Sequence, residues 1–430
     1  MSSPQQLVAR ASKVFPGGKF TRWPLMQTAY APKFLERGEG SRVWDTEGTP
    51  YVDYMCGFGA SVLGYAHPEV EAAAAAQAAK GTTLTGPTER SIELAERLVG
   101  LRPGASWAIL AKNGTDATSA AKVAARAATG RRTILREAAR PAGHDEPYWA
   151  YHGAQQWLRG AAGVLPDESS DLEAGYQFND LESVRVALEA TDGDCAAIFV
   201  GGASYPYSSQ TVMPTPEFAR GLRALATEHG ALLVLDEIRT NFRVGSSVAG
   251  GHWSELGDPS SPDGADVAPD MHCICKAVAN GHPISALVGN EAAREGAAMI
   301  TASGTFWLSG GPMSAALATL DILQADESAA MSHMQAMGGL LTDGIASQAA
   351  NYGVDITVSG PPAMPFVTFD ADDASPATRP ISSEWCAAVA EGGSWVHPFH
   401  NWYLSLSHSQ TDIEETLDAT EAAFKKITGR

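Results

Sequence analysis

Short apolar runs alternate with helix-forming stretches through the middle of the chain. The pattern predicts strands over residues 107–111, 196–200, 232–235 and 271–275, and a helix over 117–129 after the first of them. Alternation of strands with helices of about 10 to 15 residues is typical of right-handed crossovers and a mainly parallel sheet. Such a sheet binds ligands at the carboxyl ends of its strands.

The same coarse pattern divides the chain into three parts. We expect an N-terminal segment over 1–65, a large domain of alternating strands and helices over 66–320, and a C-terminal domain over 321–430 that is rich in helix signals. A chain of 430 residues, 44% of them hydrophobic, can bury a large core and normally folds as two or more domains.

The chain is acidic, with 49 Asp and Glu against 30 Lys and Arg and a formal net charge of −19. Nucleic acid and anionic membrane surfaces would be repelled at long range, so we expect neither as a partner. The charge has two interpretations: solubility alone, or attraction of a cationic substrate.

Two further features bear on location and redox state. The sequence has no run of about 18 apolar residues and no N-terminal signal pattern, so we expect a cytoplasmic protein. An odd number of cysteines in a large chain favours reduced thiols over a disulfide framework. The spacing of Cys273 and Cys275 does not match a metal motif, and we expect no bound metal.

Lys276 and Asp236 are the strongest candidates for chemistry. Lys276 ends the apolar run 271–275 and opens a turn of small residues, where a lysine can be desolvated and bonded to an aldehyde. Asp236 ends the strand 232–235 and could keep a pyridine nitrogen protonated, as pyridoxal phosphate requires. The alternatives are a surface lysine and the acid of a nucleotide triphosphatase, but the chain lacks the phosphate loop of those enzymes.

Two weaker candidates concern a phosphate and an aromatic ring. Asn113, Gly114 and Thr115 form the turn before the predicted helix, where backbone N–H groups, the Thr115 hydroxyl and the helix dipole favour a phosphate. The alternative is an ordinary helix cap made by Thr115 or Asp116. Tyr151, at the start of a glycine-containing loop, is a candidate ring for stacking on a cofactor.

The order of these motifs resembles the class III pyridoxal-phosphate aminotransferases, and within them the branch that contains glutamate-1-semialdehyde aminomutase. The resemblance covers nearly the whole chain, and its main motifs are Asn-Gly-Thr-Asp-Ala at 113–117, Tyr-His-Gly at 151–153, Leu-Asp-Glu-Ile-Arg-Thr-Asn-Phe-Arg at 235–243, Lys276, and Gly-Thr-Phe at 304–306. It implies the α/β fold type I of pyridoxal-phosphate enzymes, with a mainly parallel sheet in a large cofactor-binding domain and a smaller α+β domain. The segment 1–65 would contribute to the small domain and to the active site.

The resemblance also implies roles for the cofactor residues. Lys276 would form the Schiff base with pyridoxal phosphate and shuttle the proton, and Asp236 would pair with the pyridinium. Ile238 and Tyr151 would pack on the two faces of the ring. Asn113, Gly114 and Thr115 would hold the phosphate, while Thr305 would reach the phosphate of the neighbouring subunit in a homodimer with shared active sites.

The substrate residues are less well defined, because the chain departs from the family near the substrate. Gly201-Gly202 stands where many members have Glu-Pro, and His400 falls where the aminomutase tends to have glutamate. Arg22 resembles a position that binds a substrate carboxylate in some relatives, and the alternative is a surface arginine. Trp23 is a candidate for the entrance of the site. Cys56 is either a small buried hydrophobe or an acid/base group that faces the substrate opposite Lys276.

We therefore expect a ping-pong aminotransferase that acts on a small amine donor and a carbonyl acceptor. One partner would be an amino acid or keto acid, and the other an amino sugar, as in aminoglycoside and antibiotic biosynthesis, or another cationic amine. The alternatives are a pyridoxal-phosphate isomerase, either epimerase or aminomutase, and a non-catalytic protein that binds a nucleotide or cofactor.

Overall fold

The computed structural model describes residues 3–16, 19–20, 23–24, 34–139, 148–149, 172–205, 210–261, 264–301, 303–374 and 378–430. The chain forms two compact units. Unit 1 comprises Met1–His67, Ser208–Gln210 and His333–Arg430, and unit 2 comprises Pro68–Tyr207 and Thr211–Ser332.

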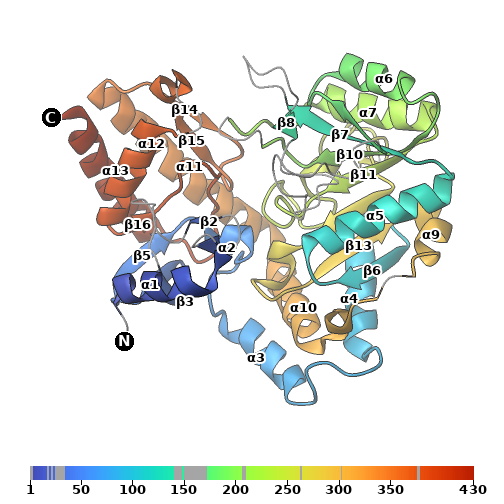
Figure 1. Ribbon diagram of the computed structural model, residues 1–430, viewed down its shortest axis with the longest axis horizontal. Helices are drawn as coiled ribbons and strands as arrows, with labels where there is room; N and C mark the ends of the chain where they lie inside the picture. Colours follow the sequence, from blue (N-terminus) through green and yellow to red (C-terminus); the bar gives the residue numbers. More distant parts are fainter. Residues whose placement is uncertain are drawn as a thin grey trace. The chain divides into compact units, whose positions relative to one another are not determined.

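Unit 2 is built on an eight-stranded sheet of described residues, in the order β6-β13-β12-β11-β10-β7-β8 with β9 beside β7 (Figure 1). Its strands are β6 (Trp107–Ala111), β7 (Thr133–Ala139), β8 (Tyr148–Trp149), β9 (Glu173–Tyr176), β10 (Cys195–Gly201), β11 (Leu232–Asp236), β12 (Met271–Ile274) and β13 (Ser285–Gly289). Only β13 and β8 run antiparallel to the other described strands. The prediction of a mainly parallel sheet is confirmed.

Unit 2 also contains helices, several of which contact its sheet. They are α3 (Pro68–Ala78), α4 (Glu89–Gly100), α5 (Gly114–Thr129), α6 (Leu181–Glu189), α7 (Pro216–Glu228), α8 (Gly251–Ser254), α9 (Glu291–Ala298) and α10 (Gly310–Ala325), with 3-10 turns η4 (Lys276–Ala279) and η5 (Thr305–Leu308). Helix α11 (Glu327–Tyr352) begins in unit 2 and ends in unit 1.

Helix α5 explains how the start of the site is held. Its small buried face, including Ala121 and Ala124, packs with Phe199 and Met271 of the sheet in one core. Residues of this size allow close approach between a helix and a sheet without a cavity. The helix ends at Thr129 because Gly130 adopts a left-handed conformation with φ of 68°. The helix begins at Gly114, about one turn before the start predicted at residue 117.

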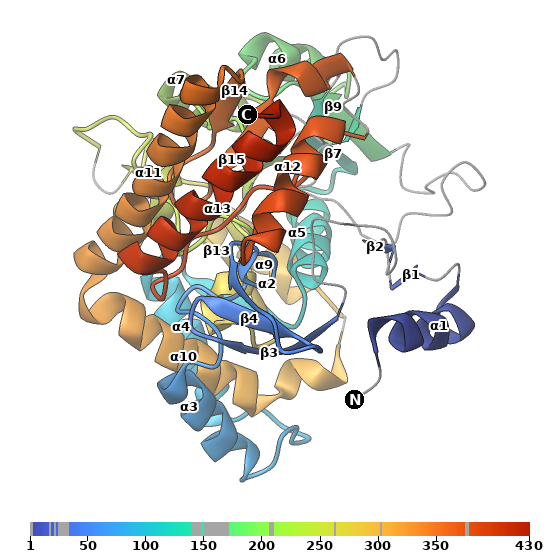
Figure 2. The same cartoon turned by 90° about the vertical axis from the view of Figure 1, so that its left-hand side faces the viewer.

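The described residues of unit 1 form three small sheets, β1-β2, β14-β15 and β16-β5-β4-β3, together with the C-terminal helices. Its described elements are α1 (Pro4–Val14), β1 (Lys19–Phe20), β2 (Trp23–Pro24), β3 (Leu35–Glu39), β4 (Arg42–Asp45), β5 (Pro50–Asp53), α2 (Cys56–Gly59), β14 (Ile356–Ser359), β15 (Phe366–Phe369), η6 (Asp370–Ala374), α12 (Pro380–Glu391), β16 (Ser394–Trp395) and α13 (Gln410–Thr428). Helices α12 and α13 lie side by side (Figure 2). Trp385, Trp402 and Phe424 form an aromatic core, with the two indole rings stacked 6.2 Å apart.

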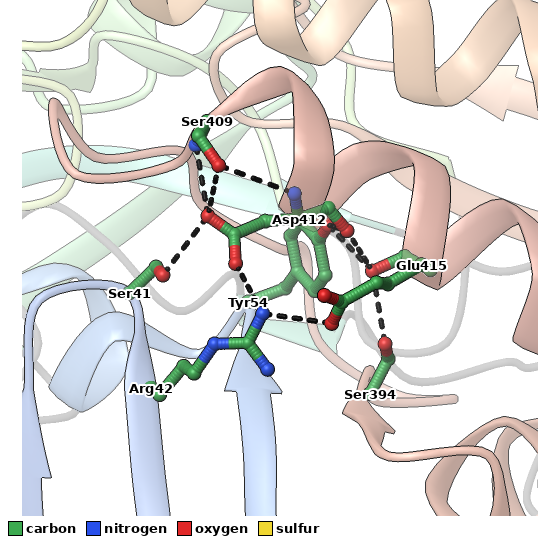
Figure 3. A network of polar contacts seen from close by, with 8 residues as sticks. Ser41, Arg42, Tyr54, Ser394, Ser409, Asp412 and Glu415 are labelled. Atoms are coloured by element: carbon green, nitrogen blue, oxygen red, sulfur yellow. Dashed lines mark hydrogen bonds and ion pairs between the residues drawn. The ribbon is translucent and has the colours of Figure 1, made fainter.

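A polar network ties the first strands of unit 1 to its last helix (Figure 3). Asp412, in the first turn of α13, accepts hydrogen bonds from Ser41 Oγ at 3.1 Å and from the Arg42 guanidinium at 2.8 Å. The same guanidinium contacts Glu415 at 2.7 Å. Tyr54 Oη lies 2.8 Å from Thr416 Oγ1 on the next turn. Residues far apart in the sequence thus fold as one unit.

Candidate active site

The carboxyl ends of β10, β11 and β12 lie level with one another in unit 2. The register pairs Gly201 with Asp236 across β10 and β11, and Asp236 with Cys273 across β11 and β12. Lys276 follows three residues beyond Cys273, at the start of η4. The sheet therefore brings the two strongest sequence candidates to the same edge, as parallel strands are expected to do.

Lys276 has an unusual backbone conformation and a lowered pKa. Its φ of 50° lies in the left-handed region, which is uncommon and costs free energy for a residue with a side chain. Burial and then the charge of Arg239 lower the pKa of Lys276 to about 7, against the opposing influence of Asp236. A lysine with this pKa is partly neutral at physiological pH and can act as a nucleophile or base.

Asp236 is buried at the end of β11, with 8% of its surface exposed. Its Oδ1 accepts a hydrogen bond from the Ile238 backbone N–H at 3.0 Å, and its carbonyl accepts one from Gly202 N–H at 3.1 Å. These bonds fix the carboxylate and the chain that follows it. A carboxylate held in this way can orient and retain a proton on a ring nitrogen.

The turn before α5 meets the same edge of the sheet. A Cβ at Gly114 would lie 2.7 Å from Ile238 Cδ1, so only glycine allows this approach. Asn113 is the N-cap residue, and Asp116 Oδ2 accepts from the backbone N–H groups of Lys112 and Asn113 at 3.1 and 2.8 Å. The helix is thus capped, and its N-terminus faces the region of Ile238, where an anion would be stabilised.

Cys275 links this turn to Lys276. The backbone N–H groups of Lys276 and Gly114 lie at its thiol and oppose the burial that raises the pKa of Cys275. Its carbonyl accepts a hydrogen bond from Asn241 Nδ2 at 3.0 Å, and Ser285 Oγ donates to the carbonyl of Asn113 at 2.7 Å. Lys276, Asn113 and the segment after β11 are therefore held together by short contacts.

Other candidates fall elsewhere in the chain. Thr305 is exposed in η5, which contacts β6 and places Phe306 with its ring centroid 5.0 Å from the Lys112 ammonium. Arg22 and Tyr151 lie outside the described residues, and Trp23 is described only by its backbone in β2.

Cys56 and His400 belong to unit 1, and their approach to Lys276 stays a prediction. The Cys56 thiol is buried and donates to the carbonyls of Asp53 and Tyr403 at 3.5 and 3.4 Å. The rings of His400 and Phe58 make an edge-to-face contact, with centroids 5.6 Å apart.

Sequence reasoning missed two residues at the edge that holds Lys276. Arg239 carries the charge with the largest effect on the pKa of Lys276, and its guanidinium carbon lies 4.1 Å from the centroid of the Tyr205 ring. Arg239 lies within the family motif at 235–243. Tyr205 follows Gly201-Gly202, where the chain departs from the family pattern. The sequence shows both residues but not their contact, because that contact depends on the register of β10 with β11.

Comparison with known proteins decides the family. Residues 26–427 match the family described as aminotransferase class-III. The chain belongs to this family. It is 41% identical to aminopentol aminotransferase of Sphingopyxis macrogoltabida over 98% of this chain and 94% of that protein. It is 31% identical to glutamate-1-semialdehyde 2,1-aminomutase of Desulfatibacillum aliphaticivorans, over 99% and 100%.

A solved structure agrees with the sequence relatives. The PLP internal aldimine form of the FumI protein of Sphingopyxis sp. MTA144 matches with a TM-score of 0.87 and 40% identity, over 99% of this chain and 96% of that one. This class III aminotransferase is therefore a fold type I enzyme that uses pyridoxal phosphate, with a small amine donor and a small carbonyl acceptor as its substrates. The predicted family, fold and cofactor are confirmed.

The described residues fit that cofactor. Lys276 offers a desolvated amine for its aldehyde, Asp236 a buried carboxylate for its ring nitrogen, and the N-terminus of α5 a set of N–H groups for its phosphate. Gly114 lacks the Cβ that would collide with Ile238, and this leaves room at the turn.

Over the described ranges, no group of His, Cys, Asp and Glu side chains is arranged to hold a metal ion. Within the same part of the chain, no helix is both long enough and apolar enough to cross a membrane.

Proposed function

We propose that the protein transfers an amino group between a hydroxylated, cationic amine and a keto acid, with Lys276 as the reacting residue. The observation that carries this proposal is the lowered pKa of Lys276 at a sheet edge shared with Asp236. Pyridoxal phosphate, when bound, supplies an electron sink for the carbanion that forms beside the substrate nitrogen.

The residues of this chain divide the remaining work. Lys276 Nζ would hold the cofactor at its aldehyde carbon and, once the incoming amine has taken that place, would carry the proton away from the amine-bearing carbon. Asp236 would hold the proton on the ring nitrogen of the cofactor, while Ile238 and Tyr151 would pack on the ring. Asn113, Gly114 and Thr115 bind the phosphate. Arg22, Trp23, Cys56 and His400 remain proposed substrate residues.

The substrate class rests on two observations. The relative at 41% identity is named an aminopentol aminotransferase, and that name denotes an amine with several hydroxyl groups, a chemistry that amino sugars share. The net charge of −19 favours approach of a cationic amine over an anionic one. A place in aminoglycoside-type or antibiotic biosynthesis is one setting for such a substrate.

The proposal extends to assembly and location. We propose a cytoplasmic homodimer in which Thr305 of each subunit reaches the phosphate held by the other. The described cysteines are all free thiols, which suits a reducing compartment. The division into an N-terminal segment 1–65, a cofactor-binding domain 66–320 and a C-terminal domain 321–430 is part of the same proposal.

The first test replaces the proposed nucleophile. We expect Lys276→Ala to lower transamination by at least about 1,000-fold and to abolish the visible absorbance that arises when the cofactor bonds to lysine. Lys425→Ala, at an exposed lysine on α13, is the matched control and should keep both properties. Full activity in Lys276→Ala would refute the proposal.

The second test identifies the donor. Purified enzyme would be titrated with hydroxylated amines, amino sugars, glutamate and alanine, and the cofactor spectrum followed before a keto acid is added. We expect the hydroxylated amines to convert the cofactor and a keto acid to restore it. The aminomutase relative at 31% identity supports one other candidate, an isomerase. Product formation that needs no keto acid would favour it.

A further inference from the structure

Arg239 and Tyr205 form a pair beside Lys276 that has no role in the proposed cofactor site. The guanidinium carbon of Arg239 lies 4.1 Å from the centroid of the Tyr205 ring, which is the geometry of a cation–π contact. Tyr205 is 7% exposed, whereas Arg239 retains partial exposure. A buried ring therefore supports a partly accessible cation.

The pair is held by the ends of two neighbouring strands. Arg239 follows β11, and Tyr205 follows β10. A Cβ at Gly202 would lie 2.3 Å from Thr240 Oγ1, so the two segments approach this closely only because residue 202 is glycine. Ser204 anchors the other side, since it exchanges backbone hydrogen bonds of 2.8 and 3.0 Å with Val212.

The same anchoring reaches a third strand. Ser204 Oγ donates to a buried Glu137 carboxylate oxygen on β7. The backbone and side-chain contacts of Ser204 thus hold in place the residue directly before Tyr205. The Gly201-Gly202 departure from the family pattern has a physical consequence: it admits the Thr240 side chain and sets Arg239 over Tyr205.

The electrostatics at Lys276 favour an anionic ligand next to this pair. Among the charges that act on Lys276, Arg239 has the largest effect and Arg243 acts in the same direction, while Asp236 opposes them. Asp236 is already assigned to the ring nitrogen of the cofactor. A negative group placed at Arg239 would gain from its guanidinium in a partly buried setting, where such attraction is weakly screened.

We propose that Arg239, supported by Tyr205, binds the carboxylate of the keto-acid acceptor and of the amino acid that it becomes. This inference rests on the proposed function and deepens it by assigning the acid half of the substrate pair. A guanidinium that lies face-on over a ring keeps its N–H donors at its edge, and that edge matches a carboxylate in bidentate geometry.

The assignment couples acceptor binding to the chemistry of Lys276. A carboxylate on Arg239 would offset the positive charge that Lys276 senses, so Lys276 would hold a proton more readily when the acid is bound. By linkage, a protonated Lys276 would in turn favour the bound acid. The amine half of the reaction, which brings no carboxylate when the donor is an amino polyol, would not use this contact.

The test compares variants of the pair in the holoenzyme with two substrates. We expect Arg239→Gln to raise the KM for the keto acid about 10- to 100-fold, as loss of a charged hydrogen-bonded contact does, with the KM for the amine changed by less than about threefold. Arg239→Lys, which keeps charge without the planar fork, should fall between. Tyr205→Leu should raise the same KM, and Tyr205→Phe, which keeps the ring, should not.

A binding readout separates this role from catalysis. Propionate, which has a carboxylate but no keto group, would be titrated into the holoenzyme by calorimetry. Arg239→Gln should weaken its binding about 10-fold or more, with cofactor affinity unchanged. Arg185→Gln, at an exposed arginine on α6, is the control and should match the wild type.

Three other results would overturn either the inference about Arg239 or the proposed function. An unchanged keto-acid KM and unchanged propionate binding in Arg239→Gln would overturn the inference. Loss of cofactor affinity, with both KM values raised equally, would assign Arg239 to the cofactor instead and would also overturn it. If the wild-type enzyme showed no keto-acid-dependent turnover, the proposed function would fail, while the propionate titration would still decide whether Arg239 binds a carboxylate.

Discussion

Lys276 combines a strained backbone with a perturbed charge, and both follow from its place in the chain. All four residues of β12 are buried, and Lys276, two residues beyond its end, turns the chain with a left-handed φ. The turn keeps the ammonium close to Arg239 and away from solvent. Desolvation and the charge of Arg239 lower the pKa of Lys276, so more of its amine is neutral and nucleophilic at physiological pH.

This charge predicts a pH dependence for loading of the cofactor. Only neutral Lys276 can attack the aldehyde. Because burial and Arg239 lower its pKa to about 7, the reloading rate of cofactor-depleted enzyme should rise with pH, with a midpoint near 7, and level off above it. The rate would be followed by the visible absorbance gained when Lys276 bonds to the cofactor.

A single substitution tests the sign. Arg239 is positive and disfavours a second positive charge, so Arg239→Gln should raise the pKa of Lys276 and move the midpoint to higher pH. Arg185→Gln should leave it in place. A midpoint near 10 in the unaltered protein would contradict the desolvated state of Lys276.

At this scale the sequence identifies residues that end a strand but not residues that meet across strands. Lys276 and Asp236 could be predicted because each follows an apolar run and chemistry limits what a lysine or acid does there. The contact of Arg239 with Tyr205 depends on the register of β10 with β11 and on the approach of Thr240 to Gly202. Neither can be read from local patterns.

Strand β11, which ends at Asp236, is followed directly by Glu237, the centre of a buried ionic cluster. Glu237 Oε2 accepts hydrogen bonds from Arg102 Nε at 3.0 Å and His272 Nδ1 at 2.8 Å, and all three residues are buried. Burial alone would raise the pKa of Glu237, but Arg102 and His272 outweigh it and lower the pKa. The carboxylate is therefore charged at neutral pH, and it joins β11, β12 and the end of α4.

Removal of this charge should be costly. We expect Glu237→Gln to lower the free energy of unfolding by about 3 to 5 kcal/mol, because Arg102 would stay buried without its counter-charge. Denaturant titration of both proteins would measure the change. Glu291→Gln is the matched control, since Glu291 pairs with Arg294 at the exposed surface, and its effect on the free energy of unfolding should be much smaller. Equal effects in the two variants would show that the cluster does not stabilise the fold.

Elements differ in how well the sequence predicts them. Helix α5 could be predicted because alanines and a terminal glycine act locally, and strands β6, β10, β11 and β12 because their apolar runs are short and bounded. The other four described strands of this sheet were not predicted from the sequence. The turn α2 could not: Cys56 and Phe58 have φ of 46° and 57°, together with two glycines of positive φ between and after them. Tertiary contacts, such as the thiol of Cys56 with the carbonyl of Tyr403, impose this conformation on residues that do not prefer it.

For the whole molecule, the alternation of strands and helices was enough to predict the sheet of unit 2, because right-handed crossovers leave few alternatives. It was harder to predict from the sequence which segments of the chain form unit 1. Its first strands are joined to its last helix by the contacts of Asp412 with Ser41 and Arg42, which are separated from it by most of the chain. Contacts of this kind leave no periodic signal in the sequence.

The proposed homodimer makes the most demanding prediction, because it assigns Thr305 to the site of the other subunit. Thr305 is exposed in the isolated chain, and its neighbour Phe306 is 62% exposed, as expected for residues that a partner would cover. Its segment also contacts β6 of its own chain, so an action within one subunit is the competing hypothesis. The two hypotheses differ in what mixed dimers can do.

Lys276→Ala and Thr305→Asp should each give an enzyme with little activity, the first without its nucleophile and the second with a negative charge against the phosphate. If sites are shared, a mixed dimer restores one complete site from Lys276 of one chain and Thr305 of the other. Random reassortment makes about half of the dimers mixed, so activity should recover to about one quarter of the wild type. If Thr305 serves its own chain, the intact residues never meet, and mixing would restore nothing.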